Sequence, residues 1–496
     1  MGEEEKVSEI QNYFEHKTVL LTGGTGFLGR LLMEKLLRTC NVKKLYIMIR
    51  PKKNKDIHER LKECFNTEIF EHLKSTNSEV FSKIVAVFAD VSKPYMGLSD
   101  RDNNVLKEEV HVVIHGAATI SFDESLRVAT NTNVRGTEEL LKLCTEMKNL
   151  SSVVCISTAY SFCVKSKVHE LFYPPPLLSH QLINIVDTFS DQVLDEFTPS
   201  IIGEWPNTYV YTKAVAEDCV KRIGSNLPVA VIRPSIVMST VNDPIPGWFD
   251  RQLGVIQIMI SIMLGVIRTF HCNFNTVADI VPADYVINCL LAAAMRVSQK
   301  RTDNDHKHIP IYNCGTSCQN PVTWRDCYKY LKQYGELTPS TLQVWKIFML
   351  QRTNSYQYLA LHFLFHLLPA FIVDSIRRSF GKKSQLVKMY QKLHRFLMLI
   401  SPFVTNQWIF DDTNTQTLWR GLSEIDKKLY PFDVKDVNWN SYFLSFVLGF
   451  RKYFLKDPTE TIAQGRLKYL KLIVGHYTII TFVGLAILSL FIYLFC

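Results

Sequence analysis

The chain has 496 residues, of which 47% are hydrophobic and 21% are charged, and its formal net charge is +9. This composition excludes collagen-like, low-complexity and wholly disordered chains, and the length allows about two to four ordinary domains. The charge alone permits a nucleic-acid surface, a membrane surface or a polyanionic ligand. Twelve cysteines without CxxC pairs argue against a disulfide scaffold and a zinc site, so we expect reduced thiols and no metal.

The first part of the chain alternates short apolar runs with amphipathic segments. Six of these runs are typical of buried parallel strands, at residues 17–22, 44–50, 84–90, 111–115, 152–157 and 229–233. Strands that alternate with helices predict an α/β fold with a doubly wound, Rossmann-type parallel sheet. From about residue 323 longer helical patterns take over, which predicts a smaller, mainly helical C-terminal domain. We expect a tail over 1–15, a nucleotide-binding domain over 16–335 and the helical domain over 345–465.

The first predicted strand leads into TGGTGFLG at residues 22–29, and a helical segment follows. Glycines in this spacing allow a tight turn, a close approach of the backbone to a pyrophosphate, and close packing of helix on strand. The helix N-terminus adds free N–H groups that favour an anion. Strand, loop and helix in this order predict a dinucleotide-binding loop, made by Thr22, Gly23, Gly26, Phe27, Leu28 and Gly29.

The second predicted strand ends in basic residues, Arg50, Lys52 and Lys53, around Pro51. An acidic residue at this place binds the ribose hydroxyls of NAD, whereas a basic cluster attracts a 2′-phosphate. The sequence therefore predicts NADPH as the cofactor, with Arg50 as the principal contact. Solvated loop charges are the alternative interpretation.

Tyr209 and Lys213 lie one helical turn apart, at i and i+4, in a segment of helical character. An ammonium beside a phenol favours the phenolate and lowers its pKa from about 10 toward the working pH, so such a pair serves acid–base chemistry. The fifth predicted strand brings Ser157 and Thr158 to the carboxyl edge of the sheet, where ligands of this fold bind. Hydroxyl, tyrosine and lysine together predict a carbonyl-polarising triad.

Residues 477–495 are apolar and carry no charge, and at about 1.5 Å per residue they reach the thickness of a bilayer core. Arg466, Lys468 and Lys471 precede them, so the positive-inside rule keeps the rest of the chain in the cytosol. We expect a single-pass C-terminal tail anchor, in the endoplasmic reticulum rather than the peroxisome. The apolar runs at 255–267 and 358–373 are too short or too interrupted to span, and fit core helices, interfacial segments or walls of a lipid pocket.

Several segments together resemble a known family. The glycine loop, residues 133–137, the STAY sequence at 157–160 and the Tyr209–Lys213 pair resemble extended short-chain dehydrogenases/reductases. Further segments narrow the resemblance to the fatty acyl-CoA reductases, at residues 207–214, 232–235, 247–250 and 279–284. Their male-sterility-type C-terminal domain is matched by residues 408–412, 439–442 and 449–453. The resemblance covers nearly the whole chain.

The resemblance implies NADPH-dependent reduction of a long-chain fatty acyl-CoA to a primary alcohol and free CoA, through an aldehyde-level intermediate, as in the supply of wax and ether lipid precursors. Tyr209 is then the proton donor, Lys213 binds the nicotinamide ribose, and Thr158 is preferred over Ser157 as the second oxyanion contact. It also implies Asp90 and Val91 near the adenine, Asn133 in the active-site network, Pro234 at the nicotinamide amide, and a cofactor wall of Gly116, Ala117 and Ala118.

Other interpretations stay open at this point. The first half would also suit a membrane-anchored extended reductase acting on a sterol or sugar-nucleotide carbonyl, and a non-catalytic, cofactor-sensing membrane scaffold is a third alternative. The expected partners are a long-chain acyl-CoA and the lipid bilayer, with no feature for nucleic acid. The sequence leaves open which acyl length and saturation are preferred, whether the aldehyde is released, and whether the protein forms a homo-oligomer. The long insertion between Thr158 and Tyr209, residues 255–267 and the C-terminal domain are expected to cover the acyl chain.

Overall fold

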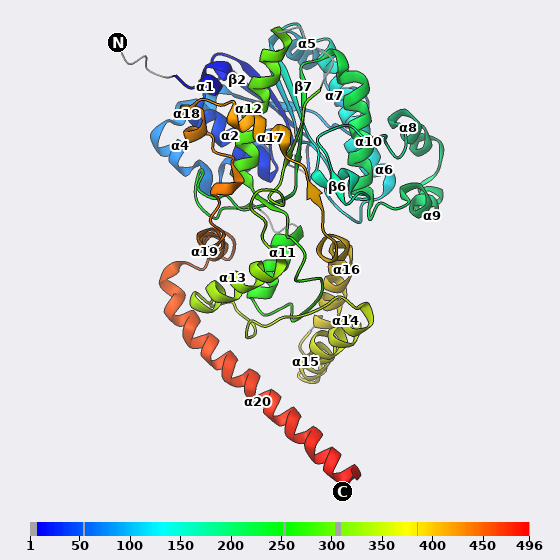
Figure 1. Cartoon of the computed structure of the whole chain (residues 1–496), viewed down its shortest axis with the longest axis vertical. Coiled ribbons are helices and arrows are strands. Elements are labelled where there is room, and N and C mark those ends of the chain that lie inside the picture. The colour runs from blue at the N-terminus through cyan, green and yellow to red at the C-terminus, as the bar shows by residue number, and fades with distance from the viewer. Residues whose placement is uncertain (1–6, 53–54, 251–253, 303–308, 384, 496) are drawn as a thin grey trace. The chain divides into compact units, whose positions relative to one another are not determined.

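The computed structural model describes residues 7–52, 55–250, 254–302, 309–383 and 385–495. The chain forms two compact units that interleave along the sequence (Figure 1). The first unit comprises Met1–Ile245, Asp279–Pro321 and Trp408–Val437, and the second comprises Pro246–Ala278, Val322–Gln407 and Asn438–Cys496. This packing differs from the expected consecutive domains over 16–335 and 345–465, because residues 246–278 and 408–437 each pack with segments distant in sequence.

The first unit is built on a seven-stranded sheet in the order β3-β2-β1-β4-β5-β7-β11, with every neighbouring pair parallel. The sheet confirms the α/β doubly wound fold and all six predicted strands, with ends that differ by at most two residues. The seventh strand, β11, was not predicted, because the polar Asn313 interrupts its four residues and leaves no continuous apolar run. The strands are β1 (Thr18–Thr22), β2 (Lys44–Ile49), β3 (Ile84–Phe88), β4 (Val112–His115), β5 (Ser152–Ile156), β7 (Val229–Pro234) and β11 (Ile311–Cys314).

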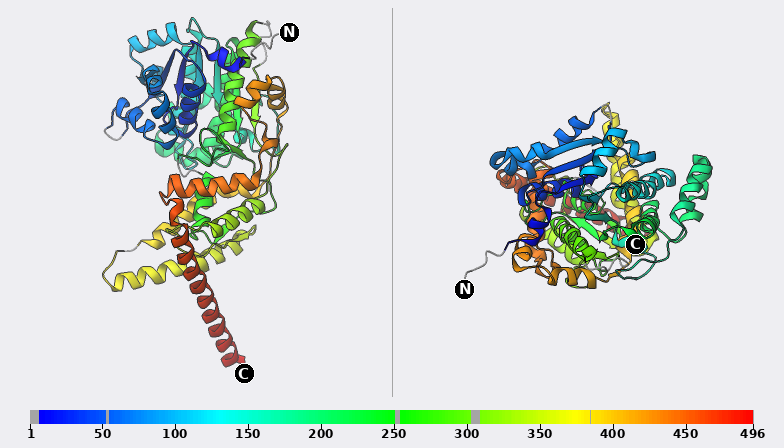
Figure 2. Two further views of the ribbon diagram at one scale, coloured as in Figure 1. Left: turned by 90° about the vertical axis from the view of Figure 1, so that its left-hand side faces the viewer. Right: turned by 90° about the horizontal axis from the view of Figure 1, so that it is seen from above.

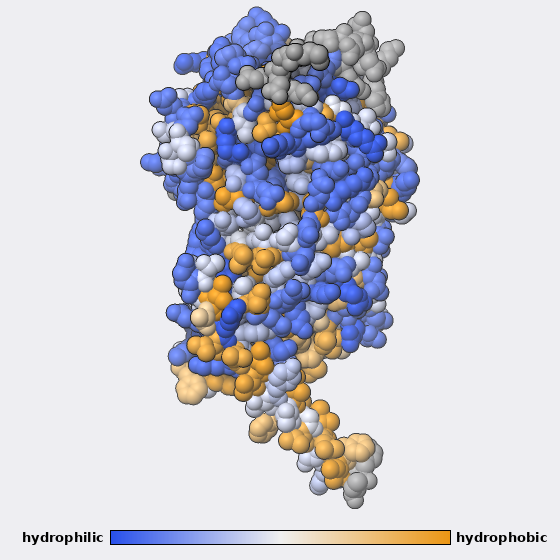
Figure 3. All heavy atoms as spheres, turned by 60° about the vertical axis from the view of Figure 1, so that its left-hand side comes forward, coloured by the Kyte–Doolittle hydropathy of each residue, from blue (hydrophilic) through white to orange (hydrophobic). Residues whose placement is uncertain are grey.

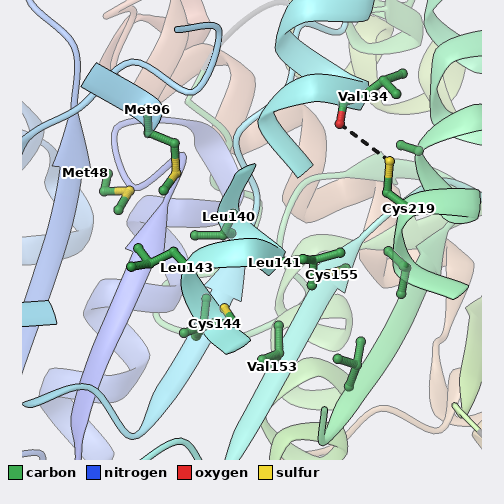
Figure 4. Packing of buried hydrophobic residues seen from close by; sticks show 14 of the residues in the cluster. Met48, Met96, Val134, Leu140, Leu141, Leu143, Cys144, Val153, Cys155 and Cys219 are labelled. Carbon is green, nitrogen blue, oxygen red and sulfur yellow. Dashed lines mark hydrogen bonds between the residues drawn. The ribbon is translucent and has the colours of Figure 1, made fainter. Parts of the chain in front are cut away.

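Helices cover both faces of this sheet, with α7 and α10 together on one face and α2 and α12 together on the other (Figures 1 and 2). A buried apolar cluster fills the space under α7 and α10, where Leu140, Leu141, Val153 and Cys219 are at most 1% exposed (Figure 4). The helices of the first unit are α1 (Glu9–Phe14), α2 (Phe27–Thr39), α3 (Ile57–Phe65), α4 (Glu71–Thr76), α5 (Asp100–Glu109), α6 (Leu126–Ala129), α7 (Gly136–Thr145), α8 (Ser179–Thr188), α9 (Asp191–Ile202), α10 (Thr208–Ile223), α12 (Ala283–Thr302), α17 (Thr413–Arg420) and α18 (Glu424–Leu429).

Residues 408–437 return to the first unit and close the long insertion between β5 and α10. Strand β13 (Ile409–Phe410) pairs in parallel with β6 (Lys167–Val168) of that insertion. The Trp408 indole donates to the Cys163 carbonyl at 2.8 Å, and the Asn313 amide donates to the Asp411 carbonyl at 2.7 Å. The returning segment is therefore hydrogen-bonded to the unit that contains the seven-stranded sheet.

The second unit is mainly helical, as the sequence predicts for the C-terminal part. Its helices are α11 (Gly254–Met263), α13 (Trp324–Leu337), α14 (Ser355–His362), α15 (Leu368–Ser379), α16 (Leu386–Thr405), α19 (Trp439–Gly449) and α20 (Ile462–Phe495), with β9 (Thr269–His271) paired to β12 (Leu350–Arg352). Strands β8 (Ile236–Met238) and β10 (Ile280–Pro282) form a further pair in the first unit. Of the alternatives for residues 255–267, the structure shows a core helix, since seven of the ten residues of α11 are buried.

Two stretches among the described residues are long and apolar enough to cross a membrane by length and composition, Ser355–Ser379 and Thr459–Leu494. The second contains most of the predicted segment 477–495, and none of its most apolar window is buried. Figure 3 shows hydrophobic side chains along α20 and around the point where it leaves the second unit. Segment 355–379 passes the same test although the sequence pattern favoured other roles for it.

Candidate active site

The glycine loop joins β1 to α2 at the carboxyl edge of the sheet, with Gly26 as the N-cap of α2. Gly23 has φ +76°, and a Cβ there would lie 2.6 Å from backbone atoms of Gly116. A Cβ on Gly29 would lie 2.4 Å from the Gly23 carbonyl oxygen. Only glycine fits where backbones approach this closely. Because Phe27 and Leu28 open α2, the first N–H groups of the helix border the loop, which suits a pyrophosphate.

The end of β4 is tied to the glycine loop by a buried histidine that the sequence analysis did not single out. The Thr22 hydroxyl accepts from the Ala117 N–H at 3.1 Å and lies 2.8 Å from His115 Nδ1. His115 Nε2 lies 3.0 Å from the Thr137 hydroxyl. Burial lowers the pKa of His115 to about 3, so the ring stays neutral and acts as a hydrogen-bonding spacer. Gly116, Ala117 and Ala118 follow it, half-buried.

Arg50 follows β2 and is exposed. A second arginine, Arg60 of α3, donates to the Arg50 carbonyl and lies 3.2 Å from the Thr25 hydroxyl of the glycine loop. Arg60 was missed because ten residues separate it from Arg50 in sequence, and only the turn of the chain into α3 brings it back. Lys52 is exposed, and Lys53 lies outside the described residues.

Asp90 and Val91 lie just beyond β3, and their contacts are with the protein itself. The Asp90 carboxylate accepts from the Ser92 N–H at 3.0 Å and the Ser92 hydroxyl at 2.7 Å. Val91 packs against Gly136, where an added Cβ would lie 3.0 Å from the Val91 side chain. These contacts fix the loop after β3 against the start of α7.

Asn133 lies in a π-helical turn and joins two parts of the site. Its side chain accepts from the Thr119 N–H at 2.9 Å and donates to the Thr119 carbonyl at 3.1 Å. It also donates to the Thr212 hydroxyl at 3.0 Å. The loop after β4 is thus bound to α10, the helix that carries Tyr209 and Lys213.

The start of α10 brings the predicted tyrosine to the predicted threonine. The Asn207 side chain caps the helix by accepting from the Val210 N–H at 3.0 Å, which places Tyr209 in the first turn. The Tyr209 ring stacks on Phe122, with centroids 5.9 Å apart. Burial raises the pKa of Tyr209 to about 12, against the opposing effect of its hydrogen bond with Thr158. The phenol is therefore protonated at neutral pH.

Lys213 is also buried, and its ammonium donates to the Ile156 carbonyl at 2.7 Å. Burial lowers its pKa to about 8. The expected lowering of the Tyr209 pKa is wrong, because loss of water around the phenol outweighs other effects. The lysine instead joins α10 to the carboxyl end of β5.

The two candidate hydroxyls after β5 have different partners. Ser157 donates to the Glu217 carboxylate at 2.7 Å, and Glu217 also accepts from Ser161 at 3.1 Å and forms a buried ion pair with Arg233 at 2.5 Å. Thr158 is hydrogen-bonded with Tyr209 and lies 3.4 Å from the Pro234 carbonyl. Thr158 therefore shares a site with the phenol, while Ser157 belongs to the Glu217 network. Glu217 and Arg233 were not predicted as part of this network, since a charged residue in an apolar run gives no sign of its partner.

The functional groups of this site are protein side chains and backbone N–H and carbonyl groups. Among the residues that the structure describes, no three His, Cys, Asp or Glu side chains gather as metal ligands. The arrangement offers a protonated phenol, a hydroxyl and an ammonium beside a glycine loop. These groups can polarise a carbonyl and bind a dinucleotide.

Comparison with known proteins identifies the family. Residues 21–290 match the model of an NAD-binding domain described as male sterility protein, and residues 365–457 match a second model of the same description. Fatty acyl-CoA reductase wat of Drosophila melanogaster is 36% identical over 95% of this chain and 90% of its own length. The chain belongs to the fatty acyl-CoA reductase family. Fatty acyl-CoA reductase 1 of Homo sapiens is 35% identical over 92% of this chain and 88% of its own length.

Solved structures support the fold of this fatty acyl-CoA reductase. The terminal R domain of a myxalamid biosynthetic pathway matches with a TM-score of 0.59 at 19% identity, covering 90% of this chain and 93% of that one. A reductase domain of a Mycobacterium tuberculosis non-ribosomal peptide synthetase matches with a TM-score of 0.56 at 17% identity, covering 90% and 95%. At these identities the likeness concerns the fold alone. The resemblance stated from the sequence is confirmed, and the family's NAD-binding domain indicates a nicotinamide cofactor.

Proposed function

We propose that this protein reduces a long-chain fatty acyl-CoA to a primary alcohol and free CoA, with NADPH as the reductant. The observation that carries the proposal is the half-buried Tyr209 side chain, whose phenol is protonated and hydrogen-bonded with Thr158 at the carboxyl edge of the sheet, in a chain of the fatty acyl-CoA reductase family. A protonated phenol and a hydroxyl side by side are the donors that a carbonyl oxygen needs as it becomes an oxyanion.

The chain's own residues perform the proton chemistry. Tyr209 donates a proton to the thioester oxygen as negative charge develops there, and Thr158 donates a hydrogen bond to the same oxygen. In the resulting hemithioacetal the hydroxyl proton returns to the Tyr209 phenolate as the C–S bond breaks, and CoA leaves as a thiolate that takes a proton from water. The aldehyde carbonyl then meets the same two donors, both protonated again. NADPH, when bound, supplies one hydride for each of the two reductions. Lys213 holds the end of β5 and offers its ammonium to the nicotinamide ribose.

The residues present fit the cofactor. The glycine loop and the start of α2 would hold the pyrophosphate, since Cβ atoms at Gly23 and Gly29 would fill the space between the backbones. Arg50, joined by Arg60, would bind a 2′-phosphate. The proposal expects Arg50→Ala and Arg60→Ala each to raise KM for NADPH but not for NADH. Equal KM values for the two cofactors in the unaltered protein would count against it.

The acyl chain needs an apolar site, and the second unit contains a small apolar cavity. Its walls come from α11 and α13 and include Val255, Ile258, Met259, Trp324 and Leu331. Each methylene buried there would contribute about 0.8 kcal/mol to binding. We propose that the apolar side chains around this cavity contact the acyl chain, and we expect Ile258→Ala to shift the preferred chain length. An unchanged length preference after this change would refute the assignment.

We further propose that α20 anchors the protein in a membrane as a single span, with the first unit in the cytosol. We propose the endoplasmic reticulum rather than the peroxisome as that membrane. The support for the anchor is the length, apolar composition and exposure of Thr459–Leu494. Alkaline extraction of membranes should leave the protein in the pellet. Protease added to sealed microsomes should digest everything before residue 477, and protection of the first unit would contradict this orientation.

The deciding experiment is turnover by the full chain in detergent. NADPH oxidation with hexadecanoyl-CoA, and hexadecanol found by mass spectrometry, would support the proposal. Tyr209→Phe should lower kcat by about 10²-fold or more. Tyr211→Phe is the matched control, because Tyr211 is a buried tyrosine of the same helix whose pKa burial also raises to about 12. Near-normal turnover by Tyr209→Phe, or turnover only with a sterol or sugar-nucleotide carbonyl, would overturn the assignment.

A further inference from the structure

Segment 355–379 has the reverse of the polarity that a helix of a soluble protein presents. Its buried positions recur every fourth residue and are mostly polar or aromatic: Tyr358, His362, His366, Ala370 and Asp374. Its exposed positions carry large apolar side chains, among them Phe363 (58% exposed), Phe371 (62%) and Ile376 (53%). A surface helix in water buries its apolar stripe and exposes its polar one. This segment does the opposite.

The buried polar groups are all engaged inside the second unit. The two histidines face one another, with Nδ1 of His362 and Nδ1 of His366 3.0 Å apart. His366 Nε2 accepts from the Arg268 N–H at 2.9 Å, and Asp374 accepts from the Leu386 and Val387 N–H groups, each at 3.1 Å. Because these partners fix the orientation of the helix, the apolar side chains are held outward.

Positive charge predominates in this segment and in the helix that follows it. Residues 355–405 contain one acidic residue, Asp374, which is buried, and seven basic residues: Arg377, Arg378, Lys382, Lys383, Lys388, Lys392 and Arg395. All seven are exposed. Lysines and arginines clustered beside an exposed apolar helix are the pattern that binds anionic lipid headgroups.

The segment lies at the same end of its unit as the outer part of α20. In Figure 1, α14 and α15 lie beside the course of α20, and in the left view of Figure 2 they run across its direction. The Trp345 indole donates to His476 Nδ1 at 3.1 Å, and Lys346 lies over the Tyr477 ring, so the second unit contacts α20 where its uncharged stretch begins. A helix that runs across the direction of a span can lie in the interface of the bilayer that the span crosses.

We propose that segment 355–379 lies in the interface of an anionic phospholipid bilayer, as a second membrane contact besides α20. The leucines and phenylalanines enter the acyl region, and the seven basic residues contact phosphate and carboxylate headgroups. The inference goes beyond the proposed reaction, and it rests on the proposed anchor only for the choice of membrane.

The test uses the full chain reconstituted in vesicles of phosphatidylcholine and phosphatidylserine. A photoreactive p-benzoylphenylalanine replaces Phe371 in one variant, Phe482 of α20 in a second and Phe197 in a third. Phe197 is the matched control, since it is a phenylalanine 58% exposed on α9. We expect phospholipid adducts at positions 371 and 482, and several-fold fewer at 197. Adducts at 482 alone, or position 371 linked to a second copy or another protein, would overturn the docking while leaving the anchor. Adducts at 371 alone would support docking and overturn the anchor, and none at either would overturn both.

The role of charge has its own comparison. Lys382→Glu combined with Lys383→Glu should lower the adduct yield at position 371 in phosphatidylserine-containing vesicles by about fivefold per residue, and far less in pure phosphatidylcholine. Lys74→Glu combined with Lys221→Glu changes the net charge equally at exposed positions outside this segment, and should leave the yield unchanged. Equal losses in both double variants would overturn the assignment of an anionic surface.

Discussion

Removing one hydroxyl at a time from Ser157 and Thr158 separates chemistry from folding in this site. Thr158→Val keeps the shape of the side chain and deletes the group that is hydrogen-bonded with Tyr209. Its other contacts are long, 3.3 Å to the Tyr160 N–H and 3.4 Å to the Pro234 carbonyl, so we expect a loss of stability of about 1 kcal/mol or less. Loss of one donor to a developing oxyanion costs about 10²–10³ in kcat.

Ser157→Ala has the opposite profile. It deletes a 2.7 Å hydrogen bond to the buried Glu217 carboxylate, and hydrogen bonds to charged groups contribute about 1.5–3 kcal/mol to stability. Glu217 keeps Arg233 and Ser161, so kcat should stay close to that of the unaltered protein.

The assay compares both variants by alcohol production at saturating acyl-CoA and by thermal unfolding in the same detergent. The reasoning is refuted if Ser157→Ala loses as much kcat as Thr158→Val, or if Thr158→Val is the less stable of the two and keeps its kcat.

Three further outcomes follow from the same structure. Glu217→Gln should destabilise the protein by about 3–5 kcal/mol, because it leaves the Arg233 guanidinium, 0% exposed, without a buried counter-charge. Asp187→Asn, at the more exposed pair with Arg135, should cost about 1 kcal/mol or less. Equal shifts in melting temperature for the two variants would contradict this. Gly23→Ala should abolish cofactor binding, measured by calorimetry, because φ is +76° and a Cβ would overlap Gly116. Gly203→Ala, with φ +57° and ψ −120° but nothing within 4 Å, should cost only backbone strain of about 1–3 kcal/mol of stability. Burial lowers the pKa of Lys213 from 10.5 to about 8, so the unfolded chain binds more protons than the folded protein between these pH values. The charged lysine therefore destabilises the folded protein fully below pH 8, and this destabilisation disappears as the pH rises toward 10.5. Lys213→Met should raise the melting temperature at pH 7 and lose that advantage by pH 10.

The elements that follow local sequence rules were predictable. The six apolar strands and the glycine loop needed no knowledge of distant residues, because a buried parallel strand and a strand–loop–helix turn carry their signals within a few residues. Tyr209 and Thr158 were also predictable, since parallel strands and the helices after them bring their ends to one edge.

The features that depend on distant partners were not predictable. Lys213 donates to the Ile156 carbonyl, and burial in the folded protein lowers the pKa of Lys213 and raises that of Tyr209. Glu217 and Arg233 look like ordinary charged residues until the fold buries them against one another. Strand β11 was missed because its local pattern is not a continuous apolar run, and Arg60 was missed because only the turn of the chain into α3 brings it to Arg50.

The return of residues 408–437 to the first unit has a consequence for how the protein is made. Strand β6 finds its partner β13, and the Asn313 amide finds the Asp411 carbonyl, only after most of the second unit has been synthesised. A nascent chain that has reached residue 335 therefore contains all the catalytic motifs, but its first unit still lacks residues 408–437. Nonsense mutations well past the last catalytic residue, and gene fragments cut at a conventional domain boundary, should give insoluble protein rather than a smaller enzyme.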